Sequence, residues 1–156
     1  MSDIKNISFE EILPIWSTYL WPNRKSLIES NSAMVYKSGY DMYNMNTIPT
    51  FFGCYVDDKL VGVNSGHSCA NNMYRSRGLW VFTEYRGKGI GKQLLIETIN
   101  QAKHENANMI WSFPKRSSWK TYNSVGFELV SDWQQSETSN ENAYCILELN
   151  EQNKQR

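Results

Sequence analysis

Three glycines at alternate positions, Gly87, Gly89 and Gly91, connect an apolar stretch to a helical pattern. Residues 79–82 before them are all apolar, and apolar residues recur at helical spacing from Ile90 onward. A strand that turns through glycines into a helix directs unpaired backbone N–H groups and the positive end of the helix dipole to one place. Glycine also permits tight turn geometry and close approach of a ligand, because it has no Cβ. The sequence therefore predicts a phosphate site at this turn.

Two common phosphate-binding motifs do not fit these glycines. A P-loop requires G-x-x-x-x-G-K-[ST], but Arg86 stands at the first glycine and Gln93 at the hydroxyl that binds magnesium. A dinucleotide fingerprint requires G-x-G-x-x-G and an acidic residue about 20 positions later, where this chain has Trp111. The cations of the turn still favour a diphosphate over a neutral ligand; they are Arg86, Lys88 and Lys92.

A third pattern, R-x-x-G-x-G after a strand, fits Arg86, Gly89 and Gly91. A second motif, Tyr-x-x-x-Gly-Phe, is matched by residues 122–127. With both motifs at this spacing, the chain resembles the GCN5-related N-acetyltransferase (GNAT) family, in which R-x-x-G-x-G binds the pyrophosphate of acyl-CoA. The resemblance covers residues 53–127 and is weak before them.

The order of elements between the two motifs is also that of the family. A helical pattern covers residues 92–105, and a short apolar strand is expected at 109–113. The resemblance implies a single α/β (α+β) domain with a mixed, mostly antiparallel central sheet flanked by helices. We expect this domain over residues 1–150, followed by a polar tail at 151–156; the length suits one domain with one core.

The resemblance implies acetyl-CoA as co-substrate and no metal. In the family, the strand before the glycine turn separates from the next strand, and the pantetheine arm enters the gap; here these strands are 79–82 and 109–113. Backbone groups around Val81 would pair with the pantetheine amides, and an N–H there would stabilise the oxyanion. The residues implied in co-substrate binding are Val81, Phe82, Arg86, Gly87, Lys88, Gly89, Ile90, Gly91 and Lys92.

Tyr122 stands where many family members protonate the departing CoA thiolate, so the resemblance implies a catalytic acid there. A phenol with a pKa of about 10 can protonate a thiolate with a pKa of about 8.5, because the final equilibrium need not favour the transfer. The alternative is a tyrosine that packs its ring on a helix face and hydrogen bonds through its hydroxyl.

A general base is less evident. Family members often supply a glutamate from the strand before the turn, but residues 74–79 contain no acidic residue. His67, near the end of the preceding strand, is the best substitute because its side chain titrates near neutral pH. A structural histidine and a water chain ending at backbone carbonyls are the alternatives. We interpret Glu84, beside the turn, as structural.

Four further cations have open roles. The family often has an asparagine at the position of Lys115, where it contacts the pantetheine arm; Lys115 and Arg116 instead either reach a CoA phosphate or form a solvated charged pair. Arg75 and Arg77 alternate along an expected strand and so lie on one face of it. They either bind a carboxylate, which suits an amino acid or small metabolite as acceptor, or remain exposed strand charges.

The N-terminal third predicts two helices. Ser8 and Glu11 form a capping box, and apolar residues then recur at helical spacing with Pro14 among them, which predicts a kink or a restart. A second helix is expected over residues 24–37. Residues 40–50 carry no clear period.

Strands dominate the pattern after residue 50. A helix is expected from Ser117 or Ser118 to Val125, where Gly126 ends it. The connector 134–142 and the residues from 150 onward are polar and expected to be mobile. The predicted strands are a hairpin of 51–56 and 60–67, then 74–82, 109–113, and a final pair at 127–133 and 143–149.

Composition narrows the function further. Lys plus Arg equals Asp plus Glu at 16 each, so no net field attracts nucleic acid or an anionic membrane. The three cysteines and two histidines lack metal-ligand spacing, and no apolar stretch has the ~18 residues of a membrane span. Without a signal-peptide pattern, a reduced, cytoplasmic setting is expected.

The resemblance implies an N-acetyltransferase that moves the acetyl group of acetyl-CoA to a primary amine of a small molecule or peptide. Direct attack in a ternary complex is expected, because the cysteines fall outside both motifs; Cys69 is the nearest to the acceptor strands. The alternative is a non-catalytic acyl-CoA sensor. A homodimer is possible for this family, and nucleic-acid binding is disfavoured by the neutral charge.

Overall fold

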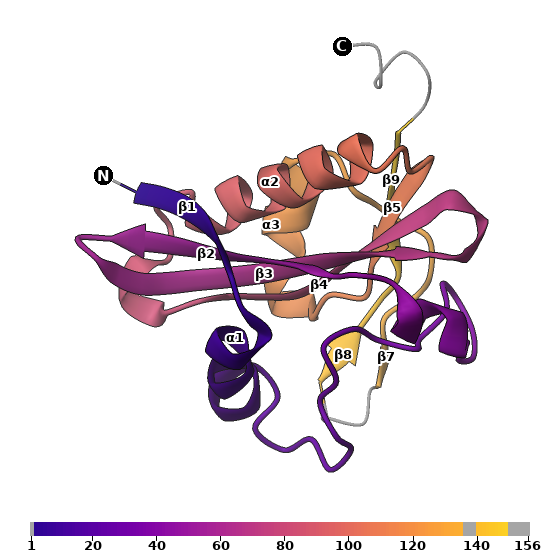
Figure 1. The fold of residues 1–156 in the computed structure, drawn as a ribbon, viewed down its shortest axis with the longest axis horizontal. Helices are drawn as coiled ribbons and strands as arrows, with labels where there is room; N and C mark the ends of the chain where they lie inside the picture. The colour runs from indigo at the N-terminus through magenta and orange to yellow at the C-terminus, as the bar shows by residue number, and fades with distance from the viewer. Residues whose placement is uncertain (1, 136–139, 150–156) are drawn as a thin grey trace.

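The computed structural model describes residues 2–135 and 140–149, which form an α/β fold around one large sheet. The sheet has seven strands in the order β1-β2-β3-β4-β5-β9-β6, and a two-stranded sheet pairs β7 with β8. β4 and β5 are parallel, whereas the other pairings of the large sheet are antiparallel. The helices α2 and α3 cover one face and α1 covers the other (Figure 1). The predicted fold class is therefore confirmed.

The element bounds follow the chain. The strands are β1 Ser2–Ile7, β2 Thr50–Val56, β3 Lys59–Cys69, β4 Met73–Val81, β5 Met109–Ser112, β6 Glu128–Leu129, β7 Gln134–Gln135, β8 Glu141–Asn142 and β9 Cys145–Glu148. The α-helices are α1 Phe9–Ile15, α2 Ile90–His104 and α3 Trp119–Ser124. The π-helix is η1 Trp16–Leu20, and the 3-10 helices are η2 Met42–Asn46, η3 Ala70–Asn72, η4 Thr83–Tyr85 and η5 Arg116–Ser118.

The predicted capping box starts α1. Ser8 Oγ accepts the backbone N–H of Glu11 at 3.1 Å, and the carboxylate of Glu11 accepts the N–H of Ser8 at 2.9 Å. Pro14 lies inside α1, and the chain changes from α- to π-helix at Trp16. A proline removes a backbone donor, which agrees with a local change of helix type after the predicted kink.

The predicted hairpin, the strand 74–82 and the helix after the glycines are all confirmed. β2 and β3 are joined by Asp57 and Asp58, which both have positive φ. The side chains of α2 that face the sheet are those expected from the period: Ile90, Leu94, Leu95, Ile99 and Ala102, all buried.

Two N-terminal predictions need correction. The helix expected over 24–37 is absent from the described chain, where the backbone forms turns and an isolated bridge between Met34 and Tyr40. The amide of Asn31 donates to the carbonyls of Asn44 in η2 and of Thr47 just after it, so this side chain links the segment to a part of the chain distant in sequence. The strand β1 was not predicted; it is a largely exposed edge strand with few apolar residues, paired with β2.

The C-terminal predictions are partly confirmed. Ser118 occupies the N-cap position of α3 but makes no side-chain cap hydrogen bond, and Gly126 follows the helix at φ 107°. The final strand pair forms between β6 and β9 and is shorter than expected. The connector expected to be mobile forms the β7–β8 pair at its ends; residues 136–139 of it, and the predicted mobile tail from residue 150, lie outside the described residues.

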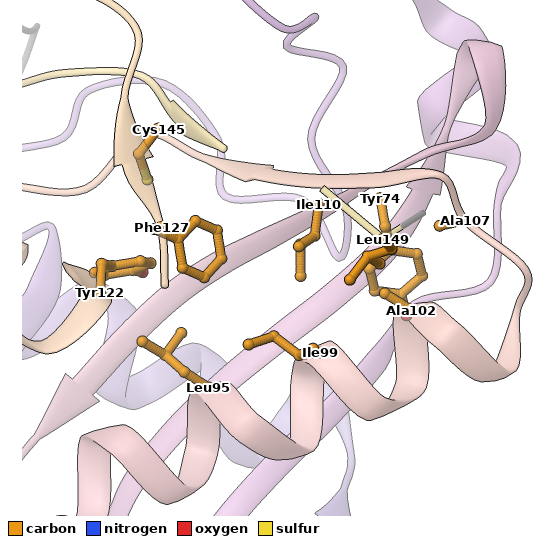
Figure 2. Close-up of a cluster of buried hydrophobic side chains, with 10 residues drawn as sticks. All are labelled: Tyr74, Leu95, Ile99, Ala102, Ala107, Ile110, Tyr122, Phe127, Cys145 and Leu149. Atoms are coloured by element: carbon orange, nitrogen blue, oxygen red, sulfur yellow. The ribbon is translucent and has the colours of Figure 1, made fainter. Parts of the chain in front are cut away.

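A cluster of ten buried residues packs α2 against the sheet (Figure 2). Leu95, Ile99 and Ala102 project from α2 toward Ile110 of β5 and toward Phe127 (Figure 2). The remaining members are Tyr74, Ala107, Tyr122, Cys145 and Leu149. This core fixes the position of α3, because Tyr122 within the helix and Phe127 shortly after it both belong to the cluster. No helix within the described residues is both long and apolar enough to span a membrane.

Candidate active site

The parallel strands β4 and β5 stop pairing in the middle of the sheet. Their register runs from Met73 opposite Met109 to Arg75 opposite Trp111, although β4 continues to Val81. Just beyond the last pair, Ser112 Oγ donates a 2.7 Å hydrogen bond to the Ser76 carbonyl. The strands therefore separate after this bond, as the family resemblance implies.

Gly78 deforms β4 at the same level. Its φ is +84°, and a Cβ built there would lie 2.3 Å from the indole nitrogen of Trp16. That nitrogen donates to the Gly78 carbonyl at 2.8 Å, and the β3–β4 register shifts nearby, between Val63 and Ser65. A glycine is required here both by the backbone conformation and by the adjacent ring.

The glycine turn leads into α2 as predicted. Gly87 and Gly89 have φ of +78° and +80°, and nothing lies within 4 Å of a Cβ at either, so the backbone conformation alone calls for glycine. Gly89 is the N-cap residue of α2, whose first N–H groups have no partner within the helix. At Gly91 a Cβ would lie 3.2 Å from Thr121 Cγ2, so this glycine lets α3 approach α2.

A cleft of about 570 Å³ opens between the turn, the end of β4 and α3. Of the residues predicted to bind the co-substrate, it is lined by Val81, Arg86, Gly87, Gly89, Ile90, Gly91 and Lys92. Phe82 does not line it and instead packs edge-on against Tyr19, with ring centroids 4.9 Å apart. Lys88 is exposed, with its ammonium 5.6 Å from the ring of Tyr85. The sequence missed the lining that α3 supplies, namely Lys120, Thr121 and Ser124.

Arg86 fastens the turn to the end of β4. Its Nε donates to the Val81 carbonyl at 2.7 Å, and its guanidinium lies 4.5 Å from the ring centroid of Trp80. The Val81 carbonyl oxygen thus already accepts one hydrogen bond from within the protein. This contact holds the turn in a fixed position relative to the separated strand.

A smaller cavity of about 40 Å³ adjoins the cleft. The two spaces share four lining residues, Leu20, Leu79, Lys115 and Ser118, so they lie side by side. The cavity reaches between the separated strands, where its lining includes Gly78, Ser112 and Tyr122. A space of this size accommodates about three water molecules, or one small polar group.

Tyr122 lies at this cavity and within the core. Its side chain is 2% exposed, and its ring packs edge-on against Phe127 at a centroid distance of 5.4 Å. Its hydroxyl oxygen lies 3.5 Å from Ser112 Oγ. Burial raises the pKa of Tyr122 to about 12, so the phenol keeps its proton at neutral pH. A protonated phenol beside the cavity is able to donate to a leaving group.

His67 lies elsewhere. It is 0% exposed and lines neither space. Nε2 accepts the backbone N–H of Ser32 at 3.3 Å, and Nδ1 lies 3.1 Å from the Ser68 carbonyl. Burial, together with the charges of Arg75 and Arg77, lowers the pKa of His67 to about 3. This environment favours the structural alternative for His67 over a base.

Lys115 and Arg116 differ in their surroundings. Lys115 is half-buried, and its ammonium donates to the Leu20 carbonyl at 2.6 Å. Arg116 is exposed and forms an ion pair with Glu141 at 3.4 Å. The solvated-pair alternative is therefore wrong for Lys115, because the carbonyl at the end of η1 lies close enough to accept a hydrogen bond from the ammonium. Burial and the charge of Arg86 lower the pKa of Lys115.

Of the two alternatives for Arg75 and Arg77, that of exposed strand charges is also wrong. They are 7% and 3% exposed, and both line the small cavity.

The cysteines are buried, and burial raises the pKa of Cys69 to about 11, which keeps it a thiol. Within the described residues, no group of three or more acidic, His or Cys side chains is placed to hold a metal ion.

The family model of the acetyltransferase (GNAT) family matches residues 15–127. An acetyltransferase of the GNAT family from Staphylococcus aureus Mu50 superimposes with a TM-score of 0.68 and 18% identity over 96% of this chain and 100% of that one. IAA acetyltransferase from Bacillus cereus ATCC 14579 has a TM-score of 0.71 and 17% identity over 96% and 100%.

A third solved structure contains the expected co-substrate. A protein assigned as a streptothricin acetyltransferase from Bacillus anthracis str. Ames, in complex with acetyl coenzyme A, has a TM-score of 0.64 and 14% identity over 96% of this chain and 99% of that one. At these identities the three structures show a shared fold. No curated protein matches the chain.

Proposed function

Because the chain belongs to the acetyltransferase (GNAT) family, we propose that it transfers the acetyl group of acetyl-CoA to a primary amine of a small molecule or peptide by direct attack. The observation that supports this proposal most strongly is that the two spaces lie side by side. The cleft that starts at the glycine turn adjoins a cavity between β4 and β5, and the protonated phenol of Tyr122 lines that cavity.

The co-substrate would occupy the cleft. The first backbone N–H groups of α2, together with Arg86 and Lys92, suit a diphosphate at the turn. The pantetheine arm would then lie along the end of β4, where the backbone lacks a partner strand on the side of β5. This arrangement would deliver the thioester to the mouth of the small cavity.

The proposed reaction has three proton movements. The neutral amine attacks the thioester carbonyl carbon, the carbon–sulfur bond breaks, and the departing thiolate takes the proton of Tyr122, which recovers one from solvent. The amine proton passes to water in the open cleft. Three cationic side chains, Arg75, Arg77 and Lys115, line the cavity. Nearby positive charge lowers the pKa of an ammonium and so favours the nucleophilic form.

Tyr122→Phe tests the acid directly. We expect thiol release to fall by about 100-fold or more while the affinity for CoA is retained, because the substitution removes only the hydroxyl group that donates the proton. Tyr144→Phe is the matched control, since Tyr144 is also buried but lines neither space. Equal activity of the Tyr122 and Tyr144 variants would remove Tyr122 from the mechanism.

The second candidate is an acyl-CoA sensor without turnover. It is favoured by the absence of an acidic side chain or histidine from the lining of the small cavity within the described chain. A sensor would bind acetyl-CoA and release no thiol with any amine. Thiol release above the hydrolytic background, dependent on an added amine, would exclude it.

A further inference from the structure

Two buried arginines lie behind the proposed reaction site. Arg75 and Arg77 alternate on β4 and face the α1 side of the sheet, where Arg77 stacks on Trp16 of η1 at 4.9 Å. The side chain between them faces the other way: Ser76 Oγ accepts from Asn64, which also donates to Thr98 of α2. Both guanidinium groups are therefore enclosed by the fold rather than displayed on its surface.

Aromatic rings hold the two guanidinium planes but leave their hydrogen-bond donors in need of partners. Arg75 lies 4.9 Å from the ring centroid of Trp111, and Arg77 lies 5.2 Å from that of Trp21. Arg77 donates one hydrogen bond, to the Glu29 carbonyl at 2.9 Å. Within the described chain, the buried Nε of Arg75 has no hydrogen-bond partner. A guanidinium has five N–H donors at its edge, which stacking does not satisfy.

Within the described residues, no carboxylate forms an ion pair with either arginine. The cavity that both arginines line has Lys115 as a third cation and, within the described chain, no acidic side chain. Burial is the main cause that lowers the pKa of both arginines, and it lowers that of Arg75 to about 10. The exposed Glu29 raises the pKa of Arg77, but it is the smallest of the causes. A buried charge without a counter-ion is unfavourable, so the site is complementary to an anion.

Asn142, which lines the same cavity, has an acceptor atom without a partner in the described chain. The amide nitrogen of Asn142 donates to the Phe113 carbonyl at 2.9 Å, while its buried Oδ1 has no partner within the described chain. Asn142 is 9% exposed and lines the cavity with the arginines. The cavity thus combines unsatisfied donors with an unsatisfied acceptor, which matches a ligand that carries both an anion and an N–H group.

The co-substrate does not supply that anion under the proposed function. Its pyrophosphate would bind at the glycine turn, and none of the turn residues 86–92 lines the small cavity. The anion must then belong to the second substrate. A cavity of about 40 Å³ holds a planar carboxylate more readily than a larger anionic group.

Resting on the proposed function, we infer that the acceptor is a small amine that carries a carboxylate, such as a free amino acid. Its carboxylate is bound by Arg75 and Arg77, and Asn142 Oδ1 accepts a hydrogen bond from its amine. Neutral amines of the same shape leave the guanidinium donors unpaired and are therefore poor substrates.

Thiol release with matched pairs of acceptors tests this assignment. Each L-amino acid is compared with its own amide, and β-alanine with β-alaninamide, at a fixed acetyl-CoA concentration. We expect kcat/KM to be at least about 30-fold higher for the best acid than for its amide. The carboxylate of an amino acid raises the pKa of its own ammonium, so without a binding site the acid would react more slowly than the amide. A preference for the acid therefore comes from the protein site. Equal rates within every pair would overturn the inference.

Variants then assign the preference to the arginines. Arg75→Gln and Arg77→Gln should each lower kcat/KM for the acid by at least about tenfold and change the value for the amide little. Arg116→Gln is the control, because Arg116 is an exposed arginine that lines neither space. Arg75→Lys and Arg77→Lys keep the charge if the glutamine variants do not fold. An equal loss for acid and amide in these variants would contradict carboxylate binding.

A binding measurement separates this inference from the proposed function. In the presence of CoA, N-acetylated amino acids should raise the Tm of the wild-type protein, whereas the corresponding N-acetyl amides should not. A shift without thiol release from any amine would refute catalysis and retain the carboxylate site. Thiol release without acid preference, and with equal shifts for acids and amides, would retain catalysis and refute the site.

Discussion

Ser112 Oγ donates a 2.7 Å hydrogen bond to the carbonyl of Ser76 where β4 and β5 stop pairing. This bond closes one end of the gap between the two strands, beside the hydroxyl of Tyr122. The gap that the proposed reaction needs is therefore bounded by a fixed contact rather than by loops alone. Because both serines are buried, the bond is shielded from water.

We expect Ser112→Ala to lower the free energy of unfolding by about 1 to 3 kcal/mol, because it leaves a buried carbonyl without its donor. Denaturant unfolding measures this change. Ser124→Ala is the control: its hydroxyl also bonds a backbone carbonyl, that of Thr121, but at an exposed position, and we expect a change within about 0.5 kcal/mol. Equal effects of the two substitutions would show that the Ser112 bond does not fix the strands.

Gly89→Ala should weaken acetyl-CoA binding as well as the fold. Alanine at φ +80° costs about 1 to 2 kcal/mol in the left-handed region, and relief of that strain would rotate the N–H groups of the turn. Gly39→Ala is a matched control, since Gly39 has φ +76° and an equally open Cβ position but lies far from the cleft in the sequence and does not line it. Calorimetry should show loss of affinity for Gly89→Ala alone; the same affinity in both variants would contradict a role for the turn.

His67 makes the stability depend on pH. Burial first, and then the two arginines, lower its folded-state pKa to about 3, although the Ser68 carbonyl opposes this, whereas the unfolded value is about 6.5. The unfolded chain therefore binds an extra proton between these values. The stability contribution is complete above pH 6.5 and falls as the pH decreases, by about 1.4 kcal/mol per unit, or about 2 kcal/mol at pH 5.

His67→Gln tests this dependence by chemical unfolding at pH 7 and pH 5. The loss of stability between the two pH values should be about 2 kcal/mol smaller for His67→Gln than for the wild type. His104→Gln, at an exposed position on α2, should leave the loss unchanged. A wild-type pH dependence in His67→Gln would mean that His67 is accessible to protons in the folded state.

Gly78→Ala tests the deformation of β4. A Cβ would meet the indole of Trp16 at 2.3 Å and the backbone has φ +84°, so strain and overpacking add. We expect about 2 to 5 kcal/mol of destabilisation, measured by thermal or denaturant unfolding. A loss no greater than that of Gly39→Ala would show that the indole moves aside easily.

Local sequence was sufficient where the structure depends on neighbours in the chain. The glycine turn, the β2–β3 hairpin and the apolar face of α2 follow from spacing and from residues that tolerate positive φ. Tyr122 was located by its motif, and its burial by Phe127 and α2 agrees with a fixed position.

The remainder depends on distant partners. The segment 24–37 reads as a helix, but Asn31 binds carbonyls of Asn44 and Thr47, and no local pattern encodes those bonds. Arg75 and Arg77 alternate like exposed strand residues, and their burial requires Trp111 and Trp16 from other elements. The environment of His67 also depends on a distant residue, because the backbone N–H of Ser32 donates to its ring.

Isothermal titration of the wild-type protein with acetyl-CoA, followed by thiol release across the acceptor pairs, tests the central claim most directly. The account predicts micromolar binding and amine-dependent thiol release that is fastest for a carboxylated amine. Absence of acetyl-CoA binding would contradict it, because the glycine turn would then be only a connection between β4 and α2.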